Sequence, residues 1–164
     1  MSLAHTHVRS LIGLGCPIRP IHHPRQVGDY CPAMPSMRET AATRPRTFAR
    51  LLGFTYVRAD AHEAVVEVMP LPEHCNERGT VHGGFLAALL DTTTGWAVHV
   101  VLPEDTAAPH FQLTVQYLNA AVPGITLRCV GRATKSGRRA AATEAEIFQD
   151  GMVVARAIAS HVVR

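Results

Sequence analysis

The feature that most constrains this chain is one long apolar segment, flanked on both sides by segments with strand patterns. Residues 83–101 carry apolar or small side chains at nearly every position of a helical pattern, and Pro103 follows shortly beyond them. A helix that is apolar nearly all round has to be enclosed, and the only other material is sheet. The sequence therefore predicts an α+β fold in which a curved antiparallel sheet wraps one central helix.

The segments around the long helix give the expected order of elements. Before it we expect a short helix and two strands, and after it four strands. Their ranges are 47–52, 54–58 and 64–69, then 111–118, 125–134, a strand ending at the Asp150-Gly151 turn, and 152–163. Alternation in the strand over 125–134 places Leu127, Cys129 and Gly131 on one face.

Length and composition suit a single domain. The chain has 164 residues, 47% of them hydrophobic, which is enough for one core. Its formal net charge of +3 is compatible with an anionic small molecule and too small to indicate nucleic acid. No segment reaches the roughly 20 apolar residues of a membrane span, and residues 11–15 are too short for a signal-peptide core. We expect a cytoplasmic protein with no membrane or nucleic-acid partner.

The N-terminal residues differ from the rest. Residues 1–38 are rich in proline and hold no sustained period, which predicts a flexible extension before a domain at 39–164. The four cysteines, at positions 16, 31, 75 and 129, form no Cys-x-x-Cys pair and no zinc-ligand spacing. We expect reduced thiols and no metal site.

Asp91 is the unusual residue of the long helix. A buried, unpaired carboxylate costs several kcal/mol, so it needs a partner or a task. On a helical wheel Asp91 shares a stripe of small residues with Gly84, whereas the leucines form the face that should meet the sheet. Asp91 is either a structural carboxylate, hydrogen-bonded to Thr94 or to a backbone amide, or a chemical group.

Gly83 and Gly84 open the same helix. Their N–H groups lack intrahelical partners and lie at the positive end of the helix dipole, where a developing oxyanion can bind. The alternative is that the two glycines serve only the geometry of the turn. Gly83 and Asp91 are separated by about 12 Å at 1.5 Å per residue, so one carbonyl cannot contact both. Cooperation between them would require two such helices packed antiparallel in a dimer.

Thioester hydrolysis is a reaction that this inventory of residues can perform. None of the serines lies in a Gly-x-Ser-x-Gly nucleophile elbow. A thioester needs little general-acid help, because its leaving thiol has a pKa of about 8.5, like that of cysteine. One carboxylate acting as base or nucleophile, together with an oxyanion hole, is chemically sufficient.

The stretch from His74 to Gly84, followed by Leu89-Leu90-Asp91, resembles the signature of hotdog-fold acyl-CoA thioesterases. The similarity is to the PaaI-type (phenylacetate-pathway) branch of the 4-hydroxybenzoyl-CoA thioesterase-like superfamily, and it covers about residues 45–163. It implies that Asp91 is the general base or nucleophile and that the Gly83 N–H binds the thioester oxygen. It also implies that Asn76 holds the water or the thioester, and that His82 supports the loop and the substrate carbonyl. In the family, Asn and Gly come from one subunit and Asp from its neighbour.

Further residues are expected at the substrate site. Gly84 lies beside the oxyanion position. His110 stands where several relatives have Ser or Thr; it could orient the water or change the acyl preference, and a one-residue slip would place Phe111 there instead. Lys135, Arg138 and Arg139 form a basic turn that could bind the phosphates of coenzyme A or could simply be a solvated hairpin turn.

The resemblance therefore implies hydrolysis of an aryl-, phenylacetyl- or medium-chain acyl-CoA to the free acid and coenzyme A. Coenzyme A is part of the substrate, and no separate cofactor is expected. The implied assembly is a homo-oligomer with active sites at the dimer interface, arranged as a dimer of dimers. Two alternatives remain open: an acyl-CoA-binding protein without catalysis, and a hydratase. A hydratase would need a catalytic His in the helix, whereas His99 has the position of a helix-end residue.

Overall fold

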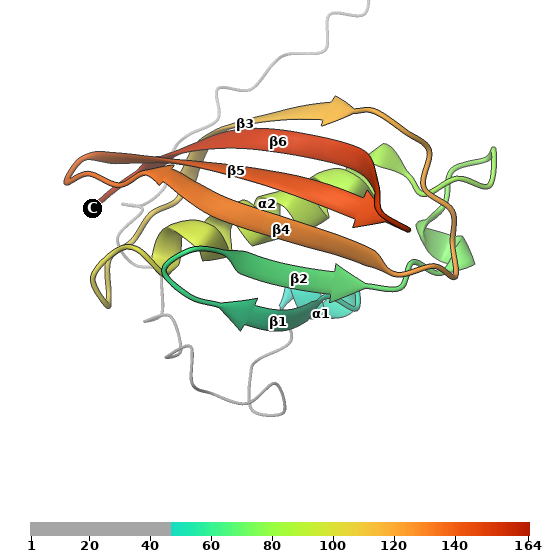
Figure 1. Ribbon diagram of the computed structural model, residues 1–164, viewed down its shortest axis with the longest axis horizontal. Coiled ribbons are helices and arrows are strands. Elements are labelled where there is room, and N and C mark those ends of the chain that lie inside the picture. Colours follow the sequence, from blue (N-terminus) through green and yellow to red (C-terminus); the bar gives the residue numbers. More distant parts are fainter. Residues whose placement is uncertain (1–46) are drawn as a thin grey trace, which may run out of the picture. The chain divides into compact units, whose positions relative to one another are not determined.

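The computed structural model describes residues 47–164 (Figure 1). The predicted extension at residues 1–38 lies outside the described residues. The elements in chain order are α1 (Phe48–Leu51), β1 (Thr55–Ala59), β2 (Ala64–Val68), the 3-10 helix η2 (Pro72–His74), α2 (Gly83–His99), β3 (His110–Tyr117), β4 (Leu127–Lys135), β5 (Ala140–Gln149) and β6 (Met152–Val162). This is the predicted order, with the long helix ending at His99 rather than at residue 101.

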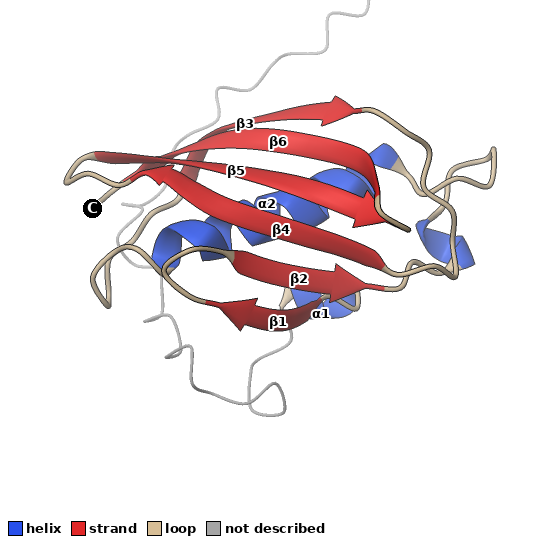
Figure 2. Cartoon of the chain, viewed as in Figure 1, coloured by secondary structure: helices blue, strands red, loops and turns tan. Residues whose placement is uncertain are grey.

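The six strands form one antiparallel sheet in the order β1-β2-β4-β5-β6-β3. The chain crosses from β2 to the far edge of the sheet through α2, so β3 pairs with β6, the last strand. The sheet curves across α2, which lies along one of its faces (Figures 1 and 2). The predicted α+β architecture is confirmed.

Strand β4 shows why the alternation was informative. Leu127, Cys129 and Gly131 are buried on the face that meets the helix, as predicted. The strand begins at Leu127 rather than at residue 125, because Leu127 pairs with Val68, the last residue of β2. Pro70 then interrupts the neighbouring chain, since proline has no N–H to donate to a ladder.

The core lies between α2 and the sheet. Leu86, Leu89 and Leu90 are buried there, so the bulky face of the helix meets the sheet as expected. Gly131 allows a close approach at this contact: a Cβ built on it would lie 3.0 Å from Cγ2 and 3.1 Å from the carbonyl oxygen of Thr93. A side chain at position 131 would therefore push the helix away from β4.

The curved sheet covers one face of α2 and leaves the stripe of small residues open. Gly84 and Asp91 are exposed on the face of the helix that points away from the sheet, and Ala87, Ala88 and Gly95 are only partly covered. A sheet that packs against one face of a helix leaves the opposite face open. Within one chain, Asp91 is therefore not a buried charge.

The first helix also differs from its prediction. Thr47 caps α1 from outside the helix, its Oγ1 accepting a hydrogen bond from the Arg50 N–H at 3.4 Å. The helix spans Phe48–Leu51 rather than 47–52; Phe48 and Leu51 are 65% and 80% exposed, whereas Leu52 packs against the core. A single helical turn offers no sustained periodicity from which the buried face can be read.

Candidate active site

The loop before α2 is organised by Asn76. Its Nδ2 donates to Oγ1 of Thr80 at 2.9 Å, and its Oδ1 accepts from the N–H of Arg78 at 2.9 Å. The Asn76 backbone N–H also donates to the Thr80 carbonyl at 2.9 Å. In this chain the side chain of Asn76 closes the turn at residues 76–80 that precedes the helix.

His82 is the N-cap of α2. Its Nδ1 accepts a hydrogen bond from the Gly84 N–H at 2.9 Å. The Gly84 N–H is therefore already hydrogen-bonded, so of the two glycines only Gly83 can offer its N–H to an oxyanion. Among residues 47–164, the Gly83 N–H donates no hydrogen bond. This leaves one backbone donor at the positive end of the helix.

Tyr117 supports this helix start, and it was not among the residues predicted for the site. Tyr117 is the last residue of β3, the edge strand opposite β1. Its hydroxyl donates a hydrogen bond of 3.0 Å to the Gly83 carbonyl. A Cβ at position 83 would lie 3.3 Å from Cζ of that ring. Gly83 therefore permits close contact with an aromatic side chain that is 34 residues away in sequence.

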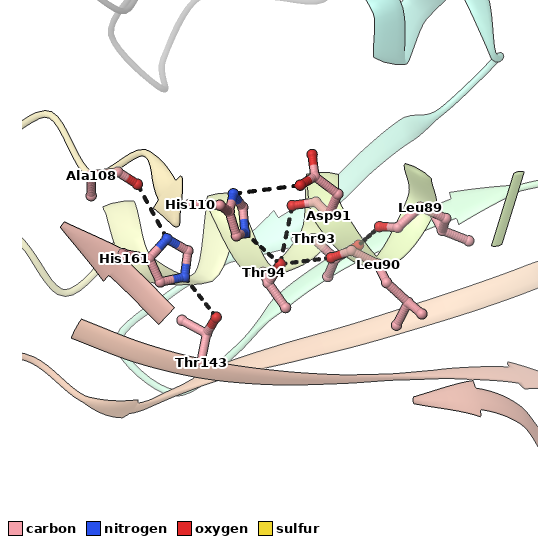
Figure 3. Close-up of polar contacts among 9 residues, drawn as sticks. All are labelled: Leu89, Leu90, Asp91, Thr93, Thr94, Ala108, His110, Thr143 and His161. Carbon is pink, nitrogen blue, oxygen red and sulfur yellow. Dashed lines mark hydrogen bonds and ion pairs between the residues drawn. The ribbon is translucent and has the colours of Figure 1, made fainter. Parts of the chain in front are cut away.

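Asp91 lies in the middle of α2 with its side chain 56% exposed. Its Oδ1 is 3.5 Å from Nδ1 of His110, the first residue of β3 (Figure 3). The structural alternative from the sequence, a bond from Asp91 to Thr94, takes a different form: the Thr94 hydroxyl lies 3.1 Å from the Asp91 backbone carbonyl. The Asp91 carboxylate itself faces outward beside an imidazole.

His110 is held by contacts on several sides. Its Nε2 is 2.9 Å from Oγ1 of Thr94, and its ring lies 4.3 Å from that of His161, centroid to centroid (Figure 3). A Cβ at position 95 would lie 3.2 Å from Cε1 of His110, so Gly95 makes room for the ring. The choice of His110 over Phe111 is consistent with this arrangement, since Phe111 is exposed.

His161 lies fully buried behind His110, and it too was absent from the predicted site. Its Nδ1 is 3.1 Å from the carbonyl oxygen of Ala108, and its Nε2 is 2.8 Å from Oγ1 of Thr143. Alternation along β6, in which Ala155, Ala157 and Ala159 face inward, was the signal that places residue 161 on the buried face.

The pKa values of the three histidines near Asp91, which are His99, His110 and His161, are all lowered, and this favours the neutral form. Burial lowers the pKa of His110, and the Asp91 carboxylate opposes this effect in part. Burial also lowers the pKa of His161, with a further contribution from His110. The pKa of His99 is lowered by burial and then by His110. Desolvation disfavours the charged imidazolium in each case.

The other predicted residues lie apart from Asp91. Lys135, Arg138 and Arg139 are exposed at the hairpin between β4 and β5. This hairpin is at the C-terminal end of α2, where Ala141 clusters with Val98, whereas Gly83 is at the N-terminal end (Figure 1). One chain therefore does not bring the basic turn and the helix N-terminus together.

The described part of the chain offers no site for a metal. It contains no group of three or more His, Cys, Asp or Glu side chains arranged to hold an ion. Cys75 and Cys129 are free thiols, and burial raises the pKa of Cys129 to about 12. Cys16 and Cys31 lie outside the described residues. None of the helices within residues 47–164 is long and apolar enough to cross a membrane.

Comparison with known proteins identifies the family. Residues 78–155 match the thioesterase superfamily. Human acyl-coenzyme A thioesterase 13 is 31% identical over 117 residues, which cover 68% of this chain and 81% of the human protein. The chain belongs to the thioesterase superfamily. It is a thioester hydrolase, as the motif around Asp91 predicted.

Solved structures support the assignment of this chain to the thioesterase superfamily. The conserved protein PA5202 from Pseudomonas aeruginosa superposes with a TM-score of 0.70 at 28% identity, covering 73% of this chain and 95% of that one. The PaaI protein from the phenylacetic acid degradation operon of Escherichia coli superposes with a TM-score of 0.64 at 25% identity, covering 70% and 86%. The predicted resemblance to PaaI-type hotdog thioesterases is confirmed.

Proposed function

We propose that this thioesterase hydrolyses acyl-CoA thioesters, with an aryl, phenylacetyl or medium-chain acyl group. The observation that carries the proposal is the position of Asp91, an exposed carboxylate on the open face of α2 with an imidazole at its side. The human relative named as an acyl-coenzyme A thioesterase and the PaaI structure support this substrate class.

The proposed reaction uses Asp91 as the base. Asp91 takes a proton from water, and the water oxygen bonds to the thioester carbon while the carbonyl electron pair moves onto oxygen. The Gly83 N–H stabilises that oxyanion, with Asn76 and His82 holding the loop and the carbonyl in position. When the carbonyl re-forms, the C–S bond breaks, and the departing thiolate takes up the proton. Attack by Asp91 itself is the second form of this mechanism.

A second subunit completes the proposed site. Gly83 and Asp91 are about 12 Å apart along one helix, so the oxyanion donor must face Asp91 of another chain. The small residues on the open face of α2 suit an antiparallel partner helix at close range. We further propose that two such dimers associate, and that Lys135, Arg138 and Arg139 bind the coenzyme A phosphates.

The test is thiol release from a panel of acyl-CoA thioesters, followed with a thiol reagent. We expect at least one acyl group of the proposed classes to be hydrolysed. Asp91→Asn should lower kcat by about 10²- to 10⁴-fold, the usual contribution of a general base, without changing the thermal melt. Glu104→Gln makes the same chemical change at an exposed loop carboxylate and should leave the rate unaltered.

The same panel separates the two alternatives. Binding of acyl-CoA without thiol release would contradict hydrolysis and indicate a binding protein. A change in enoyl absorbance without thiol would indicate a hydratase. Wild-type turnover in Asp91→Asn would refute the mechanism while leaving the substrate class intact.

A further inference from the structure

The hydrogen bonds of Thr94 determine which nitrogen of His110 carries the proton. The Thr94 hydroxyl oxygen lies 2.8 Å from the carbonyl oxygen of Leu90. Two oxygens at that distance need a proton between them, and a carbonyl has none to give. The single hydroxyl proton of Thr94 is therefore directed to Leu90. The 2.9 Å contact from Thr94 Oγ1 to His110 Nε2 must then be a bond that Nε2–H donates.

This assignment leaves Nδ1 of His110 as an acceptor. A neutral imidazole carries one N–H, so the nitrogen that lies 3.5 Å from Asp91 Oδ1 presents a lone pair. Two acceptors then converge on one point at the exposed side of α2. A water molecule that gives one hydrogen to each of them is the group that satisfies both.

The surrounding residues hold the His110 ring in this orientation. Gly95 lies under one edge, where a Cβ would come within 3.2 Å of Cε1. The His161 ring lies against the other side at 4.3 Å and is itself fixed, because its Nδ1–H donates to the Ala108 carbonyl at 3.1 Å. With Thr94 at Nε2, little freedom remains for the ring to turn.

The charges around His110 favour its neutral form. The titratable groups that face it are Asp91 and His99 from α2 and His161 from β6. Only Asp91 favours the imidazolium, and it is 56% exposed to water, whereas the His110 side chain is 20% exposed. Burial has the larger effect and lowers the pKa of His110. Protonation would place an N–H on Nδ1, which would bind Asp91 Oδ1 directly and remove the Nδ1 acceptor.

We propose that His110 is a second catalytic residue of this thioesterase, and that the attacking water is held between His110 Nδ1 and the Asp91 carboxylate. This inference rests on the proposed function. As the water oxygen bonds to the thioester carbon, one of its protons passes to the Asp91–His110 pair. The carbonyl electron pair moves to oxygen and returns as the C–S bond breaks, and the pair gives the proton to the departing thiolate. Thr94 is a positioning residue, because it sets the tautomer of His110.

The pH profile of His110→Asn tests the pair. Asparagine keeps a polar atom near the position of Nδ1 but does not titrate. In the wild type, kcat/KM should fall on the acid side as His110 is protonated. In His110→Asn we expect a plateau about 10- to 100-fold lower and no acid limb at the wild-type midpoint, because asparagine does not titrate. An acid limb at the wild-type midpoint would overturn the proposal.

Two variants of Thr94 test whether its hydroxyl determines which nitrogen of His110 carries the proton. Thr94→Val removes the acceptor of Nε2–H, so the proton can move to Nδ1 and bind Asp91. We expect a fall in kcat with little change in KM. Thr94→Ser keeps the hydroxyl and should rescue kcat and the acid limb, although it also loses the methyl group. Equal losses in the two variants would overturn the assigned role.

A measurement that needs no substrate keeps this proposal separate from the proposed function. Long-range ¹H–¹⁵N spectra of the full chain report the protonated nitrogen of each imidazole, and His110→Asn identifies the His110 signals. At neutral pH we expect Nε2–H for His110 and Nδ1–H for His161. A doubly protonated or Nδ1–H form of His110 would overturn the proposal even if acyl-CoA is hydrolysed. Absence of hydrolysis with every acyl-CoA would instead refute the proposed function.

Discussion

Two glycines of α2 each lie against an aromatic ring of β3. Gly83 faces Tyr117 and Gly95 faces His110, and a Cβ added at these positions would lie 3.3 Å and 3.2 Å from the respective rings. Glycine inside a helix costs about 1 kcal/mol relative to alanine. At position 95, the glycine that weakens the helix also leaves space for the His110 ring beside Asp91. At the scale of single residues, the site therefore depends on glycines that leave space as well as on the side chains that fill it.

Gly95→Ala separates the two effects. Alanine should raise helix stability by up to about 1 kcal/mol, while its methyl group presses on Cε1 of His110. We expect an unchanged or slightly higher melting temperature together with a several-fold lower kcat. Thermal melting and thiol release measured on the same sample check both parts. A fully active variant whose His110 NMR signals are unshifted would contradict the packing argument.

At the scale of elements, the sequence predicted most of the fold. The long helix and the inward face of β4 followed from periodicity, because Leu89 or Leu127 on the wrong face would expose a large side chain. The predicted ends of the strands were less accurate, because a strand ends where its neighbouring strand stops pairing with it. The helical wheel correctly placed Asp91 on the stripe of small residues and the leucines on the face that meets the sheet, but a wheel does not show what covers the small stripe.

Most of the predicted site residues lie in one stretch of sequence, and His110 was added to them by the family resemblance. The Asn76 to Asp91 stretch stood out as a motif. Tyr117 contacts Gly83 across 34 residues, and His161 contacts the Ala108 carbonyl across 53. Such contacts depend on the strand order, in which β3 joins the last strand, and no local pattern contains that information.

The contact between α2 and β4 gives a prediction at this scale. In Gly131→Ala the new methyl group would meet Thr93 at 3.0 Å from Cγ2 and 3.1 Å from the backbone oxygen. Overpacking of this kind typically costs about 1–3 kcal/mol, and we expect a loss of that size in urea unfolding. Thr93→Ser removes Cγ2 but keeps the hydroxyl bond to Leu89, so the double variant should lose less than the sum of the single changes. Additive losses would show that Cγ2 is not the obstacle.

At the scale of the whole molecule, one chain presents two incomplete halves of the proposed site. Gly83 and Asn76 lie at the start of α2, and Asp91 and His110 lie at its middle. The open face of the helix connects the two halves. If the halves combine across a two-fold axis, each dimer holds two sites, and each site takes one half from each chain.

Mixing two inactive variants tests this arrangement. Asn76→Ala should disable the loop half and Asp91→Asn the carboxylate half, so each variant alone should release little thiol. In a mixed dimer, one of the two sites combines both disabled halves and the other combines two intact halves. Random one-to-one assembly should therefore restore about a quarter of the wild-type activity. Co-expression with two different tags allows the mixed oligomers to be isolated and assayed.

The matched control uses two variants from the same half. Asp91→Asn mixed with His110→Asn leaves no site with an intact Asp91–His110 pair, so a mixed dimer should be no more active than the average of its parents. Restoration with Asn76→Ala but not with His110→Asn would assign Asn76 and Asp91 to different subunits of one site. Isolated mixed oligomers of Asn76→Ala and Asp91→Asn that remain inactive would contradict the shared site, because both halves of each site would then have to come from one chain despite the 12 Å or so between Gly83 and Asp91.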